Sequence, residues 1–125
     1  MLFQKRLADK ILNREKTQTR RIVKEGERFQ TFPPLPTTVL DANGRIKWQV
    51  GRDYAIQIKR GGKAVGRFWI TDIRREIVAQ ISDEDAKAEG FAGRNEFFIA
   101  WESINKQSNA NEYCWVIEFN LHLTV

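Results

Sequence analysis

The sequence predicts an α+β fold: a small, mostly antiparallel β-barrel of mixed strands with two or three short helices. The chain has 125 residues and a mass of 14.6 kDa, which is the size of one domain, so residues 1–125 are expected to form a single domain. Its 42% hydrophobic residues, with eight Phe, four Trp and two Tyr, are enough for one core. The order of predicted elements is a helix, several hairpin-connected strands, two helices and a last strand, which is typical of a curled sheet with helices at its ends.

The chain begins with a predicted helix over residues 4–13. Four apolar residues recur there at helical spacing and form one stripe: Leu7, Ala8, Ile11 and Leu12. The next segment, residues 16–23, is rich in Thr, Ile and Val and is therefore predicted to be a strand.

Two further helices are predicted in the last third of the chain. Ser82 stands three residues before Asp85, which is the spacing of a capping box, and Gly90 can end the helix in a left-handed conformation. Glu89 is then the last helical residue, where its negative charge meets the negative end of the helix dipole. A third helix over residues 95–104 is expected to bury Phe97, Phe98, Trp101 and Ile104.

Alternation of apolar and polar residues predicts the remaining strands over residues 46–50, 54–59, 64–73, 77–81 and 112–123. Three prolines place a loop over residues 29–38, a turn is predicted at residues 41–44, and Gly61-Gly62 closes a hairpin.

The last predicted strand has the cleanest alternation in the chain. We therefore expect it to be central and to bury Trp115, Ile117 and Phe119, on the face that also carries Tyr113, Leu121 and Leu123. The opposite face is the more polar one, with Cys114, Val116, Glu118, Asn120 and His122.

Charge is distributed unevenly around a net charge of +5. Residues 1–28 contain nine Lys and Arg against four Asp and Glu, and residues 45–75 contain nine against two. Residues 76–125 contain three against nine. The basic regions favour a polyanionic partner such as nucleic acid. The alternative is that the acidic third folds back onto the basic part and cancels its field.

Several classes of protein are excluded by composition. A single cysteine, Cys114, cannot form an internal disulfide, and together with the single histidine, His122, it cannot supply the four ligands of a structural zinc site. We expect no metal and no cofactor, a solvated His122, and any catalysis to use Lys, Thr, Glu or Arg. Charged residues near the N-terminus and the lack of a long apolar run predict a cytoplasmic protein with no membrane contact.

Three blocks of sequence occur together in a familiar order. They are ILNREKTQTRR at residues 11–21, VGRDYAIQ at 50–57 with its continuation through residues 66–75, and ISDEDAKAEGF at 81–91, which leads on to Phe97 and Trp101. In this order they resemble the ASCH domain of the PUA-like superfamily, in the short form found in bacteria and their phages. The resemblance implies a β-barrel with a cleft beside the first helix and a role in RNA binding or RNA metabolism.

One bacterial branch of that family deacylates N4-acetylcytidine with a Lys, a Thr and a Glu. The resemblance assigns these roles to Lys16 and Thr19 of the K-T-x-T motif and to Glu89. A Thr hydroxyl needs an adjacent base, and a Lys is a base only when its pKa is lowered. Lys16 and Thr19 lie on opposite faces of a regular strand, so they cooperate only if Lys16 sits in the corner before the strand. We then expect Lys16 and Glu89 to pair at the floor of the cleft, with Arg21 at its rim. The alternative is an ordinary basic strand with solvated side chains.

A nucleic-acid-binding surface is predicted from basic residues around glycine. Lys59, Arg60 and Lys63 surround the hairpin tip, where small residues let a phosphate backbone approach. The full set of predicted contacts is Thr17, Arg20, Arg21, Arg52, Lys59, Arg60, Lys63 and Arg67. Trp48 and Trp69 could stack on bases, although a Trp on an alternating strand is more often a core residue.

Three functions are therefore considered. The first is an RNA- or nucleotide-binding module, the second is an amidohydrolase for N4-acetylcytidine-type nucleosides that uses Lys16, Thr19 and Glu89, and the third is a phage accessory module that binds another protein. The ligand is expected to be RNA or a nucleoside, and the sequence leaves the oligomeric state open.

Overall fold

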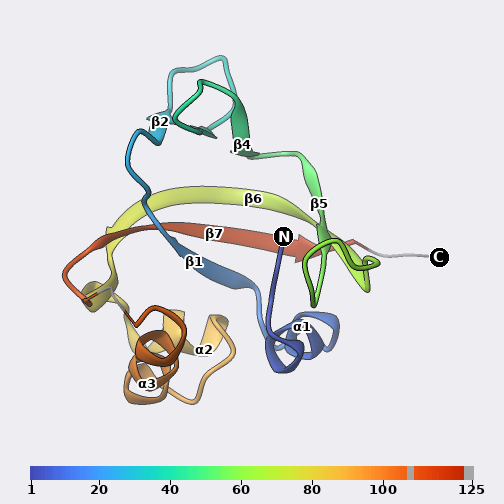
Figure 1. Cartoon of the computed structure of the whole chain (residues 1–125), viewed down its shortest axis with the longest axis vertical. Helices are drawn as coiled ribbons and strands as arrows, with labels where there is room; N and C mark the ends of the chain where they lie inside the picture. The colour runs from blue at the N-terminus through green and yellow to red at the C-terminus, as the bar shows by residue number, and fades with distance from the viewer. Residues whose placement is uncertain (107–108, 123–125) are drawn as a thin grey trace.

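The computed structural model describes residues 1–106 and 109–122 (Figure 1). The helices are α1 (Lys5–Leu12), α2 (Asp83–Ala88) and α3 (Arg94–Ile104), with a short 3-10 helix at Val78–Gln80. The strands are β1 (Gln18–Ile22), β2 (Arg28–Gln30), β3 (Thr38–Leu40), β4 (Ile46–Gln49), β5 (Asp53–Ile56), β6 (Gly66–Ile77) and β7 (Tyr113–Leu121). None of the helices described is long and apolar enough to cross a membrane.

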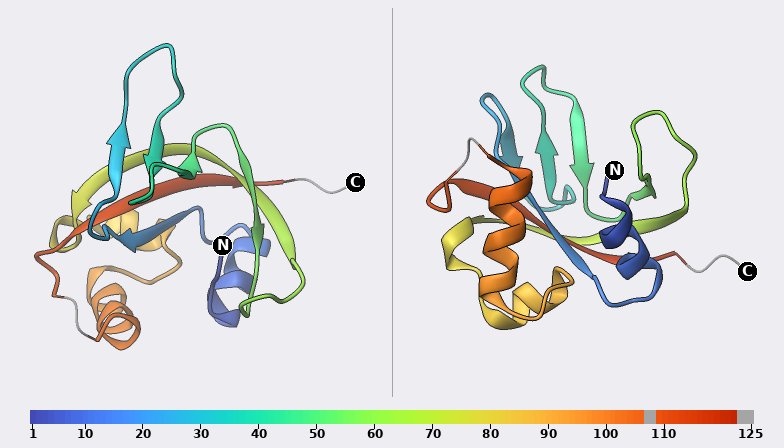
Figure 2. Two further views of the ribbon diagram at one scale, coloured as in Figure 1. Left: turned by 45° about the horizontal axis from the view of Figure 1, so that its top comes forward. Right: turned by 60° about the horizontal axis from the view of Figure 1, so that its bottom comes forward.

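The strands form two antiparallel sheets. One has four strands in the order β1-β7-β6-β5, and the other has three in the order β2-β3-β4. The long strands β6 and β7 run across the middle of the molecule, with the three-stranded sheet on one side and the helices on the other (Figures 1 and 2). The mostly antiparallel α+β fold is confirmed. A closed barrel is not, because the ladders in the described residues leave both sheets open.

The opening lies between strand β1 and the N-terminal segment. β1 is one edge strand of the four-stranded sheet, and β5 is the other. The N-terminal segment does not pair with β1 but with the residue that follows β5, through a parallel bridge between Leu2 and Gln57. A side chain spans the gap: the Arg21 guanidinium Nη2 donates to the carbonyl of Leu2 at 2.7 Å. The sheet therefore curls far enough to bring its two sides together, but no ladder within residues 1–106 and 109–122 joins them.

The prediction that the last strand is central is confirmed. β7 pairs with β1 on one side and β6 on the other, and Trp115, Ile117 and Phe119 are buried. The expectation of a polar second face is wrong at Cys114 and Val116, which are fully buried in a second cluster beneath α2 and α3. Leu123 lies outside the described residues, and Tyr113, expected on the buried face, is exposed.

Other predictions are corrected by the tertiary structure. The segment 29–38 contains parts of β2 and β3, which form because each pairs with a neighbouring strand on either side of the proline turn. Residues 77–81 are the end of β6 and the 3-10 helix, not a separate strand. Ile104 is 48% exposed, since it lies at the end of α3 where the core has ended.

The second helix follows its local sequence. The Ser82 hydroxyl accepts a hydrogen bond from the backbone N–H of Asp85 at 3.0 Å, as the capping spacing predicts. Gly90 has a φ of +102°, a conformation that favours glycine, so the chain turns sharply just after Glu89.

Candidate functional site

Lys16 lies in the corner between α1 and β1. Its backbone N–H donates to the carbonyl of Lys10 at 3.1 Å, and the next residue, Thr17, donates to the carbonyl of Ala88 at 2.8 Å. Strand β1 begins only at Gln18. Strand alternation therefore does not apply to Lys16, as the prediction of a corner position requires.

Glu89 reaches the same corner from the end of α2. A Cβ on Gly90 would lie 3.1 Å from the Lys10 side chain and 3.5 Å from the Lys16 Cβ. Gly90 thus lets the two segments approach closely. The Lys10 ammonium also donates to the carbonyl of Gly90, which fastens α1 to this turn.

The expected pairing of Lys16 and Glu89 is confirmed. The Lys16 Nζ donates to Glu89 Oε1 at 2.9 Å, to the Glu89 carbonyl at 2.9 Å and to the Gln18 carbonyl at 2.7 Å. All three N–H donors of an ammonium group are thus engaged. Lys16 is only 2% exposed. Burial lowers its pKa, Glu89 opposes that shift, and the charges of Arg21 and Arg20 lower the pKa further.

Arg20 shares the Glu89 carboxylate with Lys16. Its Nη1 donates to Glu89 Oε2 at 3.1 Å, and its Nη2 lies 3.4 Å from Asp85 Oδ2. Arg74 on β6 reaches the same Asp85 oxygen at 3.1 Å. These ion pairs connect α2 to strands β1 and β6. The charged side chains that form them therefore have a structural role.

A cleft of about 640 Å³ lies along the open edge of β1. It is bordered by the N-terminal segment, α1, β1, β4, the turn after α2, and α3. Lys16, Thr19 and Glu89 all line it, so the three residues converge on one space. No hydrogen bond within the described part of the chain engages the Thr19 hydroxyl. Because β1 is an edge strand, side chains from both of its faces border the cleft.

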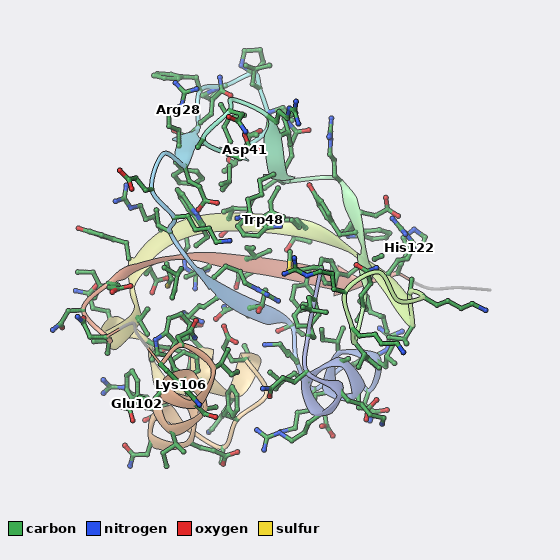
Figure 3. All side chains as sticks on the ribbon, viewed as in Figure 1. Arg28, Asp41, Trp48, Glu102, Lys106 and His122 are labelled. Carbon is green, nitrogen blue, oxygen red and sulfur yellow. The ribbon has the colours of Figure 1, made fainter. Side chains whose placement is uncertain are left out.

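The walls of the cleft combine aromatic rings with positive charge. Its aromatic residues are Phe3, Trp48, Phe91, Phe97 and Trp101, and its cationic residues are Lys16, Arg20, Arg21, Lys24 and Lys47. Among the described residues that line it, Glu89 is the one acidic residue. Figure 3 labels Trp48 over the long strands and His122 at the far end of β7, beside β5.

The other predicted contacts are not all brought to this cleft. Thr17 lines a smaller pocket of about 380 Å³ with Arg14, Trp69 and His122. The indole of Trp69 is 39% exposed and meets the His122 ring edge-on, with 5.0 Å between ring centroids.

The basic hairpin lies apart from both pockets. Arg52, Lys59, Arg60 and Lys63 are exposed and line neither of them. Arg67 is exposed and pairs with Asp53 at 2.8 Å. The predicted set is thus divided between the cleft, the smaller pocket and an exposed surface.

Sequence reasoning missed some residues that line the cleft. Lys47 comes from β4 and Lys24 follows β1, and neither was singled out. Trp101 was expected only as a core residue. The position of Lys24, soon after Arg20-Arg21, could have indicated it, but nothing local connects Lys47 or Trp101 to β1. In residues 1–106 and 109–122, no group of three or more His, Cys, Asp or Glu side chains is placed to hold a metal ion.

No family model and no curated protein sequence matches this chain. Among solved structures, the chain is similar to the ASCH domain from Lactobacillus crispatus, with a TM-score of 0.58 and 18% identity over 92% of this chain and 69% of that one. A DUF984 protein from Enterococcus faecalis aligns with a TM-score of 0.48 and 14% identity over 94% of this chain and 67% of that one. The chain has the fold of an ASCH domain.

Proposed function

We propose that this chain is an RNA- or nucleotide-binding module of the ASCH type, with its ligand in the cleft around the K-T-x-T-x-R motif. The observation that carries the proposal is the lining of the cleft, which joins five aromatic residues to five cations. Aromatic rings stack on bases, and cations neutralise phosphates. A volume of about 640 Å³ lies in the range of small-molecule sites.

A longer RNA would also meet the exposed basic hairpin. Lys59, Arg60 and Lys63 surround a tip that carries two glycines, and all three side chains are free to follow a phosphate backbone. The cleft would then bind one nucleotide, while the hairpin adds attraction that does not depend on sequence. This arrangement predicts two separable effects of mutation.

The first test measures binding of a short fluorescent single-stranded RNA by anisotropy at several salt concentrations. Removing three phosphate contacts by Lys59→Ala/Arg60→Ala/Lys63→Ala should lessen the slope of log affinity against log salt by about 2. A matched control removes the same charge elsewhere, at the exposed residues Arg28, Arg45 and Lys106. An equal change in the control, or an unchanged slope in the hairpin variant, would remove the hairpin from the proposal.

The second test addresses the cleft itself. Trp48 lines the cleft with a ring that is 8% exposed and lies 4.5 Å from the Lys47 ammonium, so Trp48→Leu should weaken binding about 10-fold by removing part of the aromatic wall and the site that holds Lys47. Trp69→Leu, outside the cleft, should have little effect. Thermal melting confirms that each variant is folded. No binding by the wild-type chain at low salt would contradict the proposed function.

A second candidate is deacylation of N4-acetylcytidine-type nucleosides. The observation that favours it is the convergence of Lys16, Thr19 and Glu89 on one cleft, with the Thr19 hydroxyl unengaged. In this reaction the Thr19 oxygen attacks the acyl carbonyl and the bond to the exocyclic nitrogen breaks. The Thr19 proton passes through Lys16 to the leaving amine, and water then hydrolyses the ester.

The hydrogen bonds that Lys16 makes in this structure limit its ability to act as a base. Lys16 has to lose a proton before it can accept one, and its three hydrogen bonds hold it as an ammonium. Burial and the two neighbouring arginines favour that proton loss by lowering the pKa of Lys16. A substrate that weakens the contacts with Glu89 would complete the activation.

The reaction is tested by following release of cytidine from N4-acetylcytidine by chromatography. Thr19→Ser should keep part of the activity because the hydroxyl survives, while Thr19→Val and Lys16→Ala should lose it. Full activity in Thr19→Val would refute the nucleophile. The absence of turnover by folded wild-type protein would leave the binding module as the function.

A further inference from the structure

Unsatisfied hydrogen-bond donors gather at one place in the molecule. Across the described residues, the buried side-chain nitrogen and oxygen atoms without a partner are Arg20 Nε, Arg21 Nε and Trp101 Nε1. All three residues line the cleft. All three atoms are N–H donors, and buried donors are normally paired. Three donors on residues that line the cleft therefore have no acceptor within the described part of the chain.

Among these residues, Trp101 is the clearest example of a buried donor without an acceptor. It lies on α3, is only 6% exposed and packs against Phe97 with 5.9 Å between ring centroids. The indole can donate but cannot accept, and a buried indole N–H usually finds a partner. Because no described residue accepts from this N–H, its acceptor has to come from outside the described part of the chain, as a bound ligand would provide.

Arg21 is a half-buried cation without a counter-ion. One of its donors reaches the carbonyl of Leu2 at 2.7 Å, and its guanidinium lies 4.8 Å from the centre of the Phe3 ring. No carboxylate of the described residues lies within 4.0 Å of it. Burial lowers the pKa of Arg21, and the charge of Glu89 only partly offsets this. An anion in the cleft would supply the missing partner.

Three of the other four cations of the cleft differ from Arg21 in this respect, and the fourth, Lys24, is exposed. Lys16 and Arg20 share Glu89, and Lys47 pairs with Glu27. Both oxygens of Glu89 are thus occupied, so this carboxylate does not repel an incoming anion with its full charge. Arg21 is left as the cation with unused pairing capacity in the buried part of the cleft.

The open edge of β1 adds backbone donors. The bonds from Phe119 N–H to the Thr17 carbonyl and from Val23 N–H to the Tyr113 carbonyl show that odd-numbered residues of this segment bond to β7. The backbone groups of Arg20 and Ile22 consequently point away from β7, toward the open edge that borders the cleft. An acceptor-rich group can bond to these N–H groups as well.

We propose that Arg21 and the indole N–H of Trp101 hold a phosphate group, so that the cleft takes a nucleotide rather than a free nucleoside. This inference rests on the proposed function and makes it more specific. The phosphate oxygens accept from Arg21 and Trp101 while the attached base packs on the aromatic walls. A phosphate monoester of a free nucleotide and a diester within an RNA strand share this chemistry.

The test measures binding by isothermal titration calorimetry with the full chain. The three ligands are cytidine, its 5′-monophosphate, and a cytidine dinucleotide without a terminal phosphate. The monophosphate is expected to bind at least 10-fold more tightly than cytidine. The dinucleotide separates the two sources, because equal affinity for it indicates a diester and weaker affinity indicates a terminal monoester. The other three nucleosides and their monophosphates are measured in the same way.

Two variants connect this preference to the proposed residues. Trp101→Phe keeps an aromatic ring and removes the N–H, while Arg21→Lys keeps the charge and removes the planar set of donors. Each should reduce affinity for the phosphorylated ligand about 10-fold and leave cytidine binding nearly unchanged. Trp69→Phe serves as the matched control and should change neither affinity.

The outcomes separate this inference from the proposed function. Equal affinity for nucleosides and their monophosphates would overturn the inference and leave the proposed function intact. A phosphate preference that persists in both variants would also overturn it. Binding of none of these ligands, nor of single-stranded RNA, would instead overturn the proposed function itself.

Discussion

Replacing Glu89 by Gln removes the charge that two buried cations share, with almost no change in shape. Lys16 loses its ion pair at 2.9 Å and Arg20 loses one at 3.1 Å. Breaking a buried ion pair by removing one partner usually costs about 3–5 kcal/mol, because an uncompensated charge is left behind. Lys16 keeps two carbonyl acceptors and Arg20 keeps Asp85. We therefore expect the low end of that range, about 3 kcal/mol.

The loss is measured by urea denaturation at pH 7, followed by circular dichroism, as a fall in the midpoint at constant slope. The same loss should lower the melting temperature by roughly 10 °C for a chain of this length. Glu102→Gln, at an exposed position on α3, makes the same chemical change and should cost less than about 0.5 kcal/mol.

A double-mutant cycle separates the ion pair from other effects of the substitution. Lys16→Met and Glu89→Gln together should destabilise the protein by at least about 1 kcal/mol less than the sum of the single changes, because each removes the same interaction. A loss below about 1 kcal/mol for Glu89→Gln, or full additivity in the cycle, would refute the view that this buried pair fixes α2 to the sheet.

Three other expectations concern the fold. Ile117→Ala should cost about 2–5 kcal/mol in urea denaturation, since the side chain is fully buried in the central strand. Burial alone would raise the pKa of Glu27, but hydrogen bonds from Lys47, the Lys24 backbone and Trp115 outweigh it and lower the pKa. The resulting stability is present above the unfolded pKa near 4.5 and is lost as pH falls through the lowered folded value, so Lys47→Gln should lessen the loss of stability in acid; an unchanged acid profile would contradict the pairing. Burial raises the pKa of the Cys114 thiol to about 12, so a disulfide reagent at pH 8 should modify it only after unfolding; rapid modification of the folded chain would show that it is accessible.

Features set by local sequence could be predicted. Ser82 and Gly90 define the ends of α2 because a capping hydroxyl and a left-handed glycine act over a few residues. The alternation of β7 identified a central strand from the period of its side chains alone. The corner position of Lys16 and its pairing with Glu89 came from the resemblance to the ASCH domain, joined to the argument that strand alternation keeps Lys16 and Thr19 apart.

Features that depend on contact between two distant segments could not be predicted from the sequence. The second face of β7 carries polar residues toward one end, yet Cys114 and Val116 are buried because α2 and α3 fold over them. The strands on either side of the proline turn form because each pairs with a neighbouring strand. The propensities of the residues in a segment do not indicate which other segment it will pair with.

The difference between what the sequence determines and what the tertiary structure decides is largest at the cleft. The sequence by itself determined the chemistry available, since it supplied the K-T-x-T-x-R motif, a cation-rich first half and Glu89 just before a glycine. Only the tertiary structure decided that β1 stays an edge strand, that Trp101 from α3 and Lys47 from β4 border the same cleft, and that Arg21 lies there with no counter-ion among the described residues. The physical reason is that spacing along the chain controls turns and caps, whereas burial and charge pairing depend on which surfaces meet when the whole sheet curls.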